Sequence, residues 1–142
     1  MMIVPAATAP SRSLGRSILA VAVGFFSVAV LSLVTDQILH VLNVYPPWGE
    51  PMWDTSDNVL ALSYRVIYTV FGGYITASLA PHSPMRHVWV LAILGLLMST
   101  MGAIAAITMA DLGPTWYPMA LALTAVPCVW LGGVLYLQRR TA

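Results

Sequence analysis

The chain has 142 residues, of which 59% are hydrophobic and only 8% are charged. Soluble domains carry about 25% charged residues and disordered chains are poor in apolar ones, so this composition excludes both classes. The formal net charge of +1 argues against a nucleic-acid partner, because it provides no basic field to release counterions. The single cysteine, Cys128, excludes an internal disulfide and is expected to be a small packing residue.

The first predicted element is a membrane-spanning helix over about residues 17–38. A helix needs about 20 mainly apolar residues to cross about 30 Å of hydrocarbon, and this stretch is long enough. Arg12 and Arg16 precede it as they would in a signal peptide, but the apolar run exceeds the roughly 7–15 residues of a signal core and no A-x-A site follows. Residues 1–15, rich in Pro, Ala, Ser and Thr, are predicted to be a flexible cytoplasmic tail.

Three further apolar stretches predict spanning helices over about residues 59–80, 88–110 and 116–137. Pro127 should bend the last of them. The stretches are too long and too uniformly apolar for barrel strands, which run about 9–11 residues with alternating polarity. We therefore predict an all-α integral membrane protein: a four-transmembrane-helix bundle that forms one domain over residues 16–142, with the lipid bilayer as its surroundings.

Charge predicts the orientation of this bundle. The arginines outside the spans fall in the two terminal segments and in the connection between the second and third spans, whereas acidic residues fall in the other two connections. These arginines are Arg12, Arg16, Arg86, Arg139 and Arg140, and these acids are Glu50, Asp54, Asp57 and Asp111. The arginine bias predicts that both termini are cytoplasmic, in the plasma (inner) membrane. The aromatic residues of the longest connection, residues 44–56, are expected to lie in the headgroup layer.

Small residues on the spans predict where the helices meet. Gly95, Ser99, Gly102 and Ala106 form one continuous stripe on the third span. Helices in lipid associate through close packing of such residues, so this face is expected to lie against another helix. The pairs at 72–73 and 132–133 are Gly-Gly, and they are expected to allow close helix approach for the same reason.

Arg65 is the one charged residue inside the second span. A charge at the centre of a span costs about 2.5–3.5 kcal/mol on insertion scales, so it generally has a partner or a function. At the helical rise of about 1.5 Å per residue, Arg65 lies roughly 6 Å from the depth of Asp36 in the first span. Asp36 and His40 share one helix face, and the Arg65 side chain leans toward their level. The sequence thus predicts a polar cluster of Asp36, His40 and Arg65 near the outer face.

Two interpretations of this cluster remain open: a structural ion pair, or a pocket that binds an anion or passes a proton. Asp36 and His40 have the residue types and spacing of metal ligands, and Glu50, Asp54 or Asp57 could be added to them. Nothing requires a metal there, since zinc sites show three or four clear ligands, and we predict none. The chain contains no nucleophile elbow, zinc-protease motif or phosphate-binding loop, and we expect no cofactor. The leading hypothesis is a non-enzymatic accessory or structural membrane subunit, with a membrane-protein partner or as a homo-oligomer. The alternative is a small oligomeric transporter or channel that uses the polar cluster.

Overall fold

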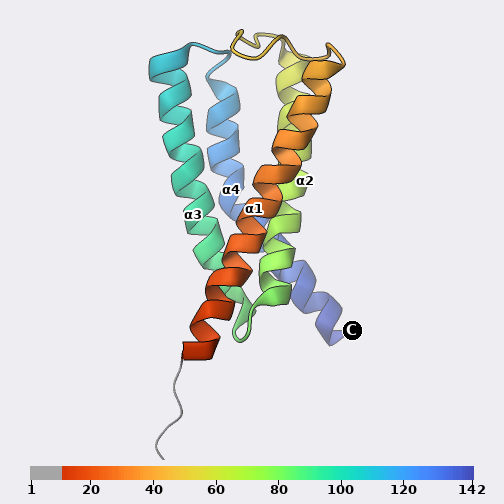
Figure 1. Ribbon diagram of the computed structural model, residues 1–142, viewed down its shortest axis with the longest axis vertical. Coiled ribbons are helices and arrows are strands. Elements are labelled where there is room, and N and C mark those ends of the chain that lie inside the picture. Colours follow the sequence, from red (N-terminus) through yellow and green to blue (C-terminus); the bar gives the residue numbers. More distant parts are fainter. Residues whose placement is uncertain (1–10) are drawn as a thin grey trace, which may run out of the picture.

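The computed structural model describes residues 11–142 and is all-helical within them (Figure 1). Its elements are α1 (Ser11–Val41), α2 (Thr55–Leu79), α3 (Pro84–Ala105), the π-helical turn η1 (Ala106–Ala110) and α4 (Trp116–Thr141). Four helices are long and apolar enough to cross a membrane, which confirms this part of the predicted fold. Large apolar side chains remain exposed on all of them, as expected where lipid rather than protein covers the surface.

The helices extend beyond the apolar stretches that predicted them. α1 begins at Ser11, so residues 11–15 belong to a helix and not to the predicted tail. The rest of that tail, residues 1–10, lies outside the described residues. α2 begins at Thr55 because the Asp54 side chain accepts a hydrogen bond from the Ser56 backbone N–H at 2.8 Å, which is the bond of a helix N-cap. Hydropathy thus located the apolar part of each helix and missed the first turn of α1, α2 and α3, whereas α4 begins at the predicted residue, Trp116.

Glycine allows the closest helix approach at the crossing of α2 and α4. A Cβ atom on Gly73 would overlap the Val129 backbone oxygen, and one on Gly132 would overlap the Val70 backbone oxygen. Gly24 and Gly72 allow the same approach between α1 and α2, where the Thr76 hydroxyl also bonds to a backbone oxygen of α1. The Gly-Gly pairs therefore serve the close packing that the sequence predicted.

The small-residue stripe of α3 does not pack as predicted. A Cβ atom on Gly95 or Gly102 would meet no atom within 4 Å. The buried face of α3 includes Val88 and Ala92, and the stripe continues that face seven residues further on. Toward the end of the bundle that carries the 42–54 and 111–115 connections, here termed the loop end, α3 and α1 diverge (Figure 1). The stripe therefore faces a cavity and not a neighbouring helix.

The two connections at the loop end are bonded to each other. The Met52 backbone N–H donates to the Leu112 backbone oxygen at 2.7 Å, and the Asn58 side chain donates to the Met52 oxygen at 2.9 Å. Tyr45 is buried against α2 residues, whereas Trp48 is exposed. The headgroup location of these aromatics stays a prediction, but Tyr45 is covered by protein and not by lipid. Its side chain folds into the bundle and fixes the connection in place.

We predict that Gly132→Ala destabilises the bundle, whereas Gly95→Ala does not. The new methyl group at position 132 meets the α2 backbone, which cannot rotate away, and overpacking of this kind costs about 1–3 kcal/mol or more. At position 95 the methyl group has open space, and alanine favours helix over glycine. Thermal unfolding in one detergent checks both variants. Equal stability of the two would contradict the assigned α2–α4 contact.

Candidate functional site

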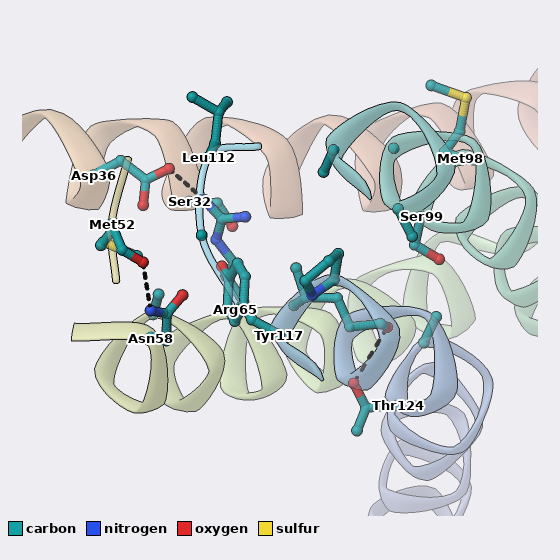
Figure 2. Close-up of a pocket in the computed structure, with 18 of the residues that line it drawn as sticks. Ser32, Asp36, Met52, Asn58, Arg65, Met98, Ser99, Leu112, Tyr117 and Thr124 are labelled. Carbon is teal, nitrogen blue, oxygen red and sulfur yellow. Dashed lines mark hydrogen bonds and ion pairs between the residues drawn. The ribbon is translucent and has the colours of Figure 1, made fainter. Parts of the chain in front are cut away.

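A buried ion pair joins α1 to α2 within the membrane-spanning region. Arg65 Nη2 lies 2.5 Å from Asp36 Oδ2, and the Asp36 residue is only 5% exposed (Figure 2). No other ion pair is found among the side chains that the structure describes, which are those of residues 13–108 and 111–142. A carboxylate buried to this extent is stable only when it is paired and hydrogen-bonded. The structure thus brings together two of the three residues of the predicted cluster.

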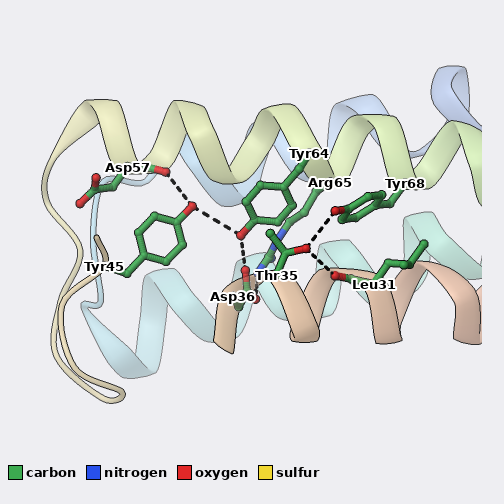
Figure 3. A network of polar contacts seen from close by, with 8 residues as sticks. All are labelled: Leu31, Thr35, Asp36, Tyr45, Asp57, Tyr64, Arg65 and Tyr68. Atoms are coloured by element: carbon green, nitrogen blue, oxygen red, sulfur yellow. Dashed lines mark hydrogen bonds and ion pairs between the residues drawn. The ribbon is translucent and has the colours of Figure 1, made fainter. Parts of the chain in front are cut away.

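Tyrosines supply the remaining contacts of this carboxylate. The Tyr64 hydroxyl donates to Asp36 Oδ1, the oxygen not used by Arg65 (Figure 3). The Tyr45 hydroxyl lies 3.4 Å from that of Tyr64 and 3.3 Å from the Asp57 backbone oxygen. Burial raises the pKa of the Tyr45 hydroxyl above its ordinary value, so this group remains a neutral donor at physiological pH. Hydroxyl contacts therefore extend from Asp36 toward the start of α2, and the single Tyr45 proton serves one of its two acceptors at a time.

A second polar contact lies further along the same α1–α2 seam. The hydroxyl groups of Thr35 and Tyr68 are 2.9 Å apart, and the Thr35 hydroxyl also bonds to the Leu31 backbone oxygen at 2.9 Å (Figure 3). Polar side chains of α1 and α2 are thus paired with one another across the seam. Interhelical hydrogen bonds of this kind contribute to helix association in lipid.

His40 belongs to the same region but not to the ion pair. Its Nδ1 lies 2.6 Å from the Pro46 backbone oxygen, so this nitrogen carries the proton and donates. The His40 ring also packs on the Trp48 indole, with ring centroids 4.0 Å apart, and Trp48 in turn donates to Gln37. His40 therefore holds the long connection on α1, and no hydrogen bond joins it to Asp36 in the described structure.

A cavity of about 640 Å³ lies beside the ion pair (Figure 2). All four helices and both loop-end connections contribute to its wall. Most of the wall is apolar, and Leu91 and Val129 from the main hydrophobic core line it. The polar side chains in the wall are few; they are Ser32, Asp36, His40, Glu50, Asn58, Arg65, Thr69, Ser99, Thr115, Tyr117 and Thr124. Binding sites for small molecules have this size and this mixture of a largely apolar wall with few polar groups.

Arg65 is the charged side chain from α2 in this wall. Its Cζ lies 6.0 Å from the centre of the Tyr117 ring, which belongs to α4. Its Nε is buried and lacks a hydrogen-bond partner in the described part of the chain. A guanidinium has five N–H donors, and the contact with Asp36 uses one of them. The Nε is out of reach of the cavity, but the Arg65 side chain is 30% exposed, so its remaining Nη N–H groups can donate to a molecule there while Arg65 stays paired with Asp36.

The sequence reasoning missed the tyrosines of the site. Tyr45 and Tyr64 bond in the network, and Tyr117 packs near Arg65. Tyrosine close to a span end also suits the aromatic belt at the membrane interface, so its presence alone did not mark a partner. One signal could have identified Tyr64. A buried carboxylate needs a second hydrogen-bond donor besides Arg65, and Tyr64 directly precedes Arg65 in the chain.

No group of three or more metal-ligating side chains is found among the described residues. Comparison with protein-family models, curated proteins and solved structures finds no match to this chain.

We predict that Arg65→Leu and Asp36→Leu each destabilise the bundle, and that the double variant recovers part of the loss. Each single change leaves one charge without its partner, which typically costs about 3–5 kcal/mol in a buried pair. The cost should be smaller here because the Arg65 side chain is 30% exposed. Thermal unfolding of the four proteins gives the coupling energy. Strictly additive losses would contradict the assigned pair.

Proposed function

We propose that this chain is a non-enzymatic accessory protein of the membrane, and that its loop-end cavity binds a mainly apolar molecule with a neutral oxygen acceptor at one end. The observation that carries the proposal is the cavity of about 640 Å³ with the Asp36–Arg65 pair in its otherwise largely apolar wall. Pockets of this kind fix a ligand through a few polar groups and gain affinity from the apolar contact.

The charge state of the site favours a neutral ligand. Asp36 already balances the charge of Arg65, so an anionic ligand would leave one negative charge in excess in a poorly solvated place. The Arg65 side chain is 30% exposed, and the N–H groups of Nη1 and Nη2 that do not contact Asp36 are unused donors in the cavity wall. A carbonyl or ester oxygen satisfies such a donor without adding charge.

The shape of the α3 wall favours a long apolar body for the ligand. Gly95, Ser99 and Gly102 line the cavity, and their small side chains leave it wide along about two turns of α3. Burial of apolar surface there supplies roughly 25 cal/mol per Å². A helix of a partner protein would also suit a small-residue face, but it would leave the Arg65 donors without an acceptor.

The transporter alternative has less support. A transport pathway needs an exit at the opposite end of the bundle, and the hydrophobic core lies in that direction. Leu91 and Val129 line the cavity, and the same core continues through the fully buried Ala77, Val88 and Ala92. Moving an ion or proton through this region would require it to cross apolar side chains without polar partners.

We further propose that both termini are cytoplasmic and that the protein lies in the plasma membrane. The arginines of the α2–α3 connection and of the end of α4 support this orientation, because short cytoplasmic segments carry an excess of Lys and Arg. The cavity then opens in the outer half of the membrane.

We predict that a cysteine placed at position 54 reacts with an impermeant thiol reagent from outside intact cells, whereas one at position 86 reacts only after the membrane is opened. Both side chains are exposed in the structure, so accessibility depends on the side of the membrane and not on burial. Cys128 is replaced by alanine in both proteins, because it is the native thiol. The reverse labelling would contradict the orientation.

We predict that Gly102→Leu abolishes ligand binding and leaves the bundle folded. The leucine side chain projects into open space in the cavity wall and displaces the ligand body. Gly15→Leu is the matched control, because that position also has open space but lies outside the cavity. The probes are dioleoylglycerol, oleate and octadecane, and the measurement is the rise in melting temperature of the detergent-solubilised protein.

Dioleoylglycerol is expected to stabilise the wild type and the Gly15→Leu protein, and to have no effect on Gly102→Leu. Oleate carries a negative charge and octadecane has no oxygen, so both should stabilise less than dioleoylglycerol. Equal effects of dioleoylglycerol on all three proteins would contradict binding in this cavity. A larger effect of oleate would contradict the neutral acceptor.

A further inference from the structure

A second hollow lies at the opposite end of the bundle, between the first half of α1 and the start of α3. It is a groove of about 650 Å³. Its apolar wall consists of Ile18, Val21, Ala22, Phe25 and Phe26 from α1 with Val90 and Leu94 from α3. The groove lies within membrane-spanning segments, so its apolar part faces lipid chains and not water.

Polar and basic groups lie at one end of this groove. Arg86, His82 and His87 line it where α3 begins. Arg86 is exposed and stands in the first turn of α3, and the N-cap residue of that helix, Ser83, makes no side-chain cap hydrogen bond. Pro84 has no N–H and the Arg86 N–H donates to the Ser83 backbone oxygen at 3.0 Å, so the positive charge at this place comes mainly from the Arg86 guanidinium, with a smaller contribution from the helix dipole.

No protein carboxylate balances Arg86 among the described residues. The one ion pair between side chains there is that of Asp36 and Arg65, on the seam between α1 and α2. The remaining acids, Glu50, Asp54, Asp57 and Asp111, belong to the loop end of the bundle. The basic end of the groove is therefore complementary to an anion supplied from outside the chain.

We infer that this groove binds an anionic phospholipid, with its phosphate at Arg86 and one acyl chain along the apolar wall. Basic pockets between membrane helices bind anionic headgroups, and arginine can hold a phosphate through two parallel hydrogen bonds. Along the groove, the charged residues lie where α3 starts and the apolar residues lie further into the spanning segments. A phospholipid has the same arrangement, with a charged headgroup followed by apolar chains.

The site is distinct from the loop-end cavity in its ligand chemistry. The cavity presents an arginine already neutralised by Asp36, whereas the groove presents an arginine without a carboxylate partner in residues 11–142. A free phosphate ion would use the basic end alone and would leave the apolar wall unused. The groove thus favours a lipid over a soluble anion.

The test measures binding of phosphatidylglycerol to the full-length protein in detergent, with phosphatidylcholine and inorganic phosphate as comparison probes. We expect phosphatidylglycerol to raise the melting temperature more than phosphatidylcholine does, and phosphate to have no effect. Arg86→Gln should weaken phosphatidylglycerol binding about five- to tenfold, because one basic residue near an anionic headgroup contributes about that factor. Arg140→Gln is the control, since it removes the same charge from an exposed arginine outside the groove.

A second variant tests the apolar part of the groove. Val90 is 54% exposed and lines the groove, so Val90→Trp fills the space for the acyl chain and keeps the basic end intact. It should weaken phosphatidylglycerol binding while the melting temperature without lipid stays unchanged. Equal weakening by Arg86→Gln and Arg140→Gln would overturn the site, because general electrostatic attraction would then explain the binding. A rise in melting temperature with inorganic phosphate, or unweakened phosphatidylglycerol binding by Val90→Trp, would overturn the proposal that an acyl chain lies in the groove.

Discussion

The burial of the Asp36 carboxylate is the constraint on which the loop half of the molecule depends. A charge in this position is stable only when it is paired and hydrogen-bonded, and the chain meets the requirement with one donor on each carboxylate oxygen, Arg65 and Tyr64. The Tyr64 hydroxyl lies within hydrogen-bonding distance of the Tyr45 hydroxyl, and Tyr45 packs the long connection against α2. One acidic residue on α1 thus contributes both to the pairing of α1 with α2 and, through the tyrosines, to the position of the long connection.

The all-helical architecture was predictable because the bilayer imposes it. Backbone groups within hydrocarbon must bond internally, so long apolar runs become helices whatever their exact sequence. The contact of Asp36 with Arg65 was also predictable, since helical rise places the two at similar depths. The Gly-Gly pairs at 72–73 and 132–133 marked close crossings correctly. These features follow from the sequence of a single helix, or from the depths of two residues on neighbouring helices.

The predictions that failed depend on features that periodicity and hydropathy do not describe: the divergence of helices, the path of a connection and the polar caps of helices. The stripe from Gly95 to Ala106 has the residue types of a packed face, but α3 separates from α1 along that part of its length. Its small side chains therefore create space where they were expected to allow contact. His40 was grouped with Asp36 by its spacing on α1, and its bond to the Pro46 oxygen depends on the path of a connection that periodicity does not describe. Helix ends were missed because caps such as Asp54 are polar.

The bond between Met52 and Leu112 has a consequence for how molecules reach the cavity. It fastens the two loop-end connections together, and residues of both connections line the cavity at that end. Separating them to admit a molecule from water would break this bond and the Asn58 contact that supports it. A molecule that entered instead between α1 and α3, which diverge toward the loop end and both line the cavity, would come from the hydrocarbon. Occupancy would then follow the mole fraction of ligand dissolved in the bilayer, and a sparingly soluble compound could saturate the protein at a negligible aqueous concentration.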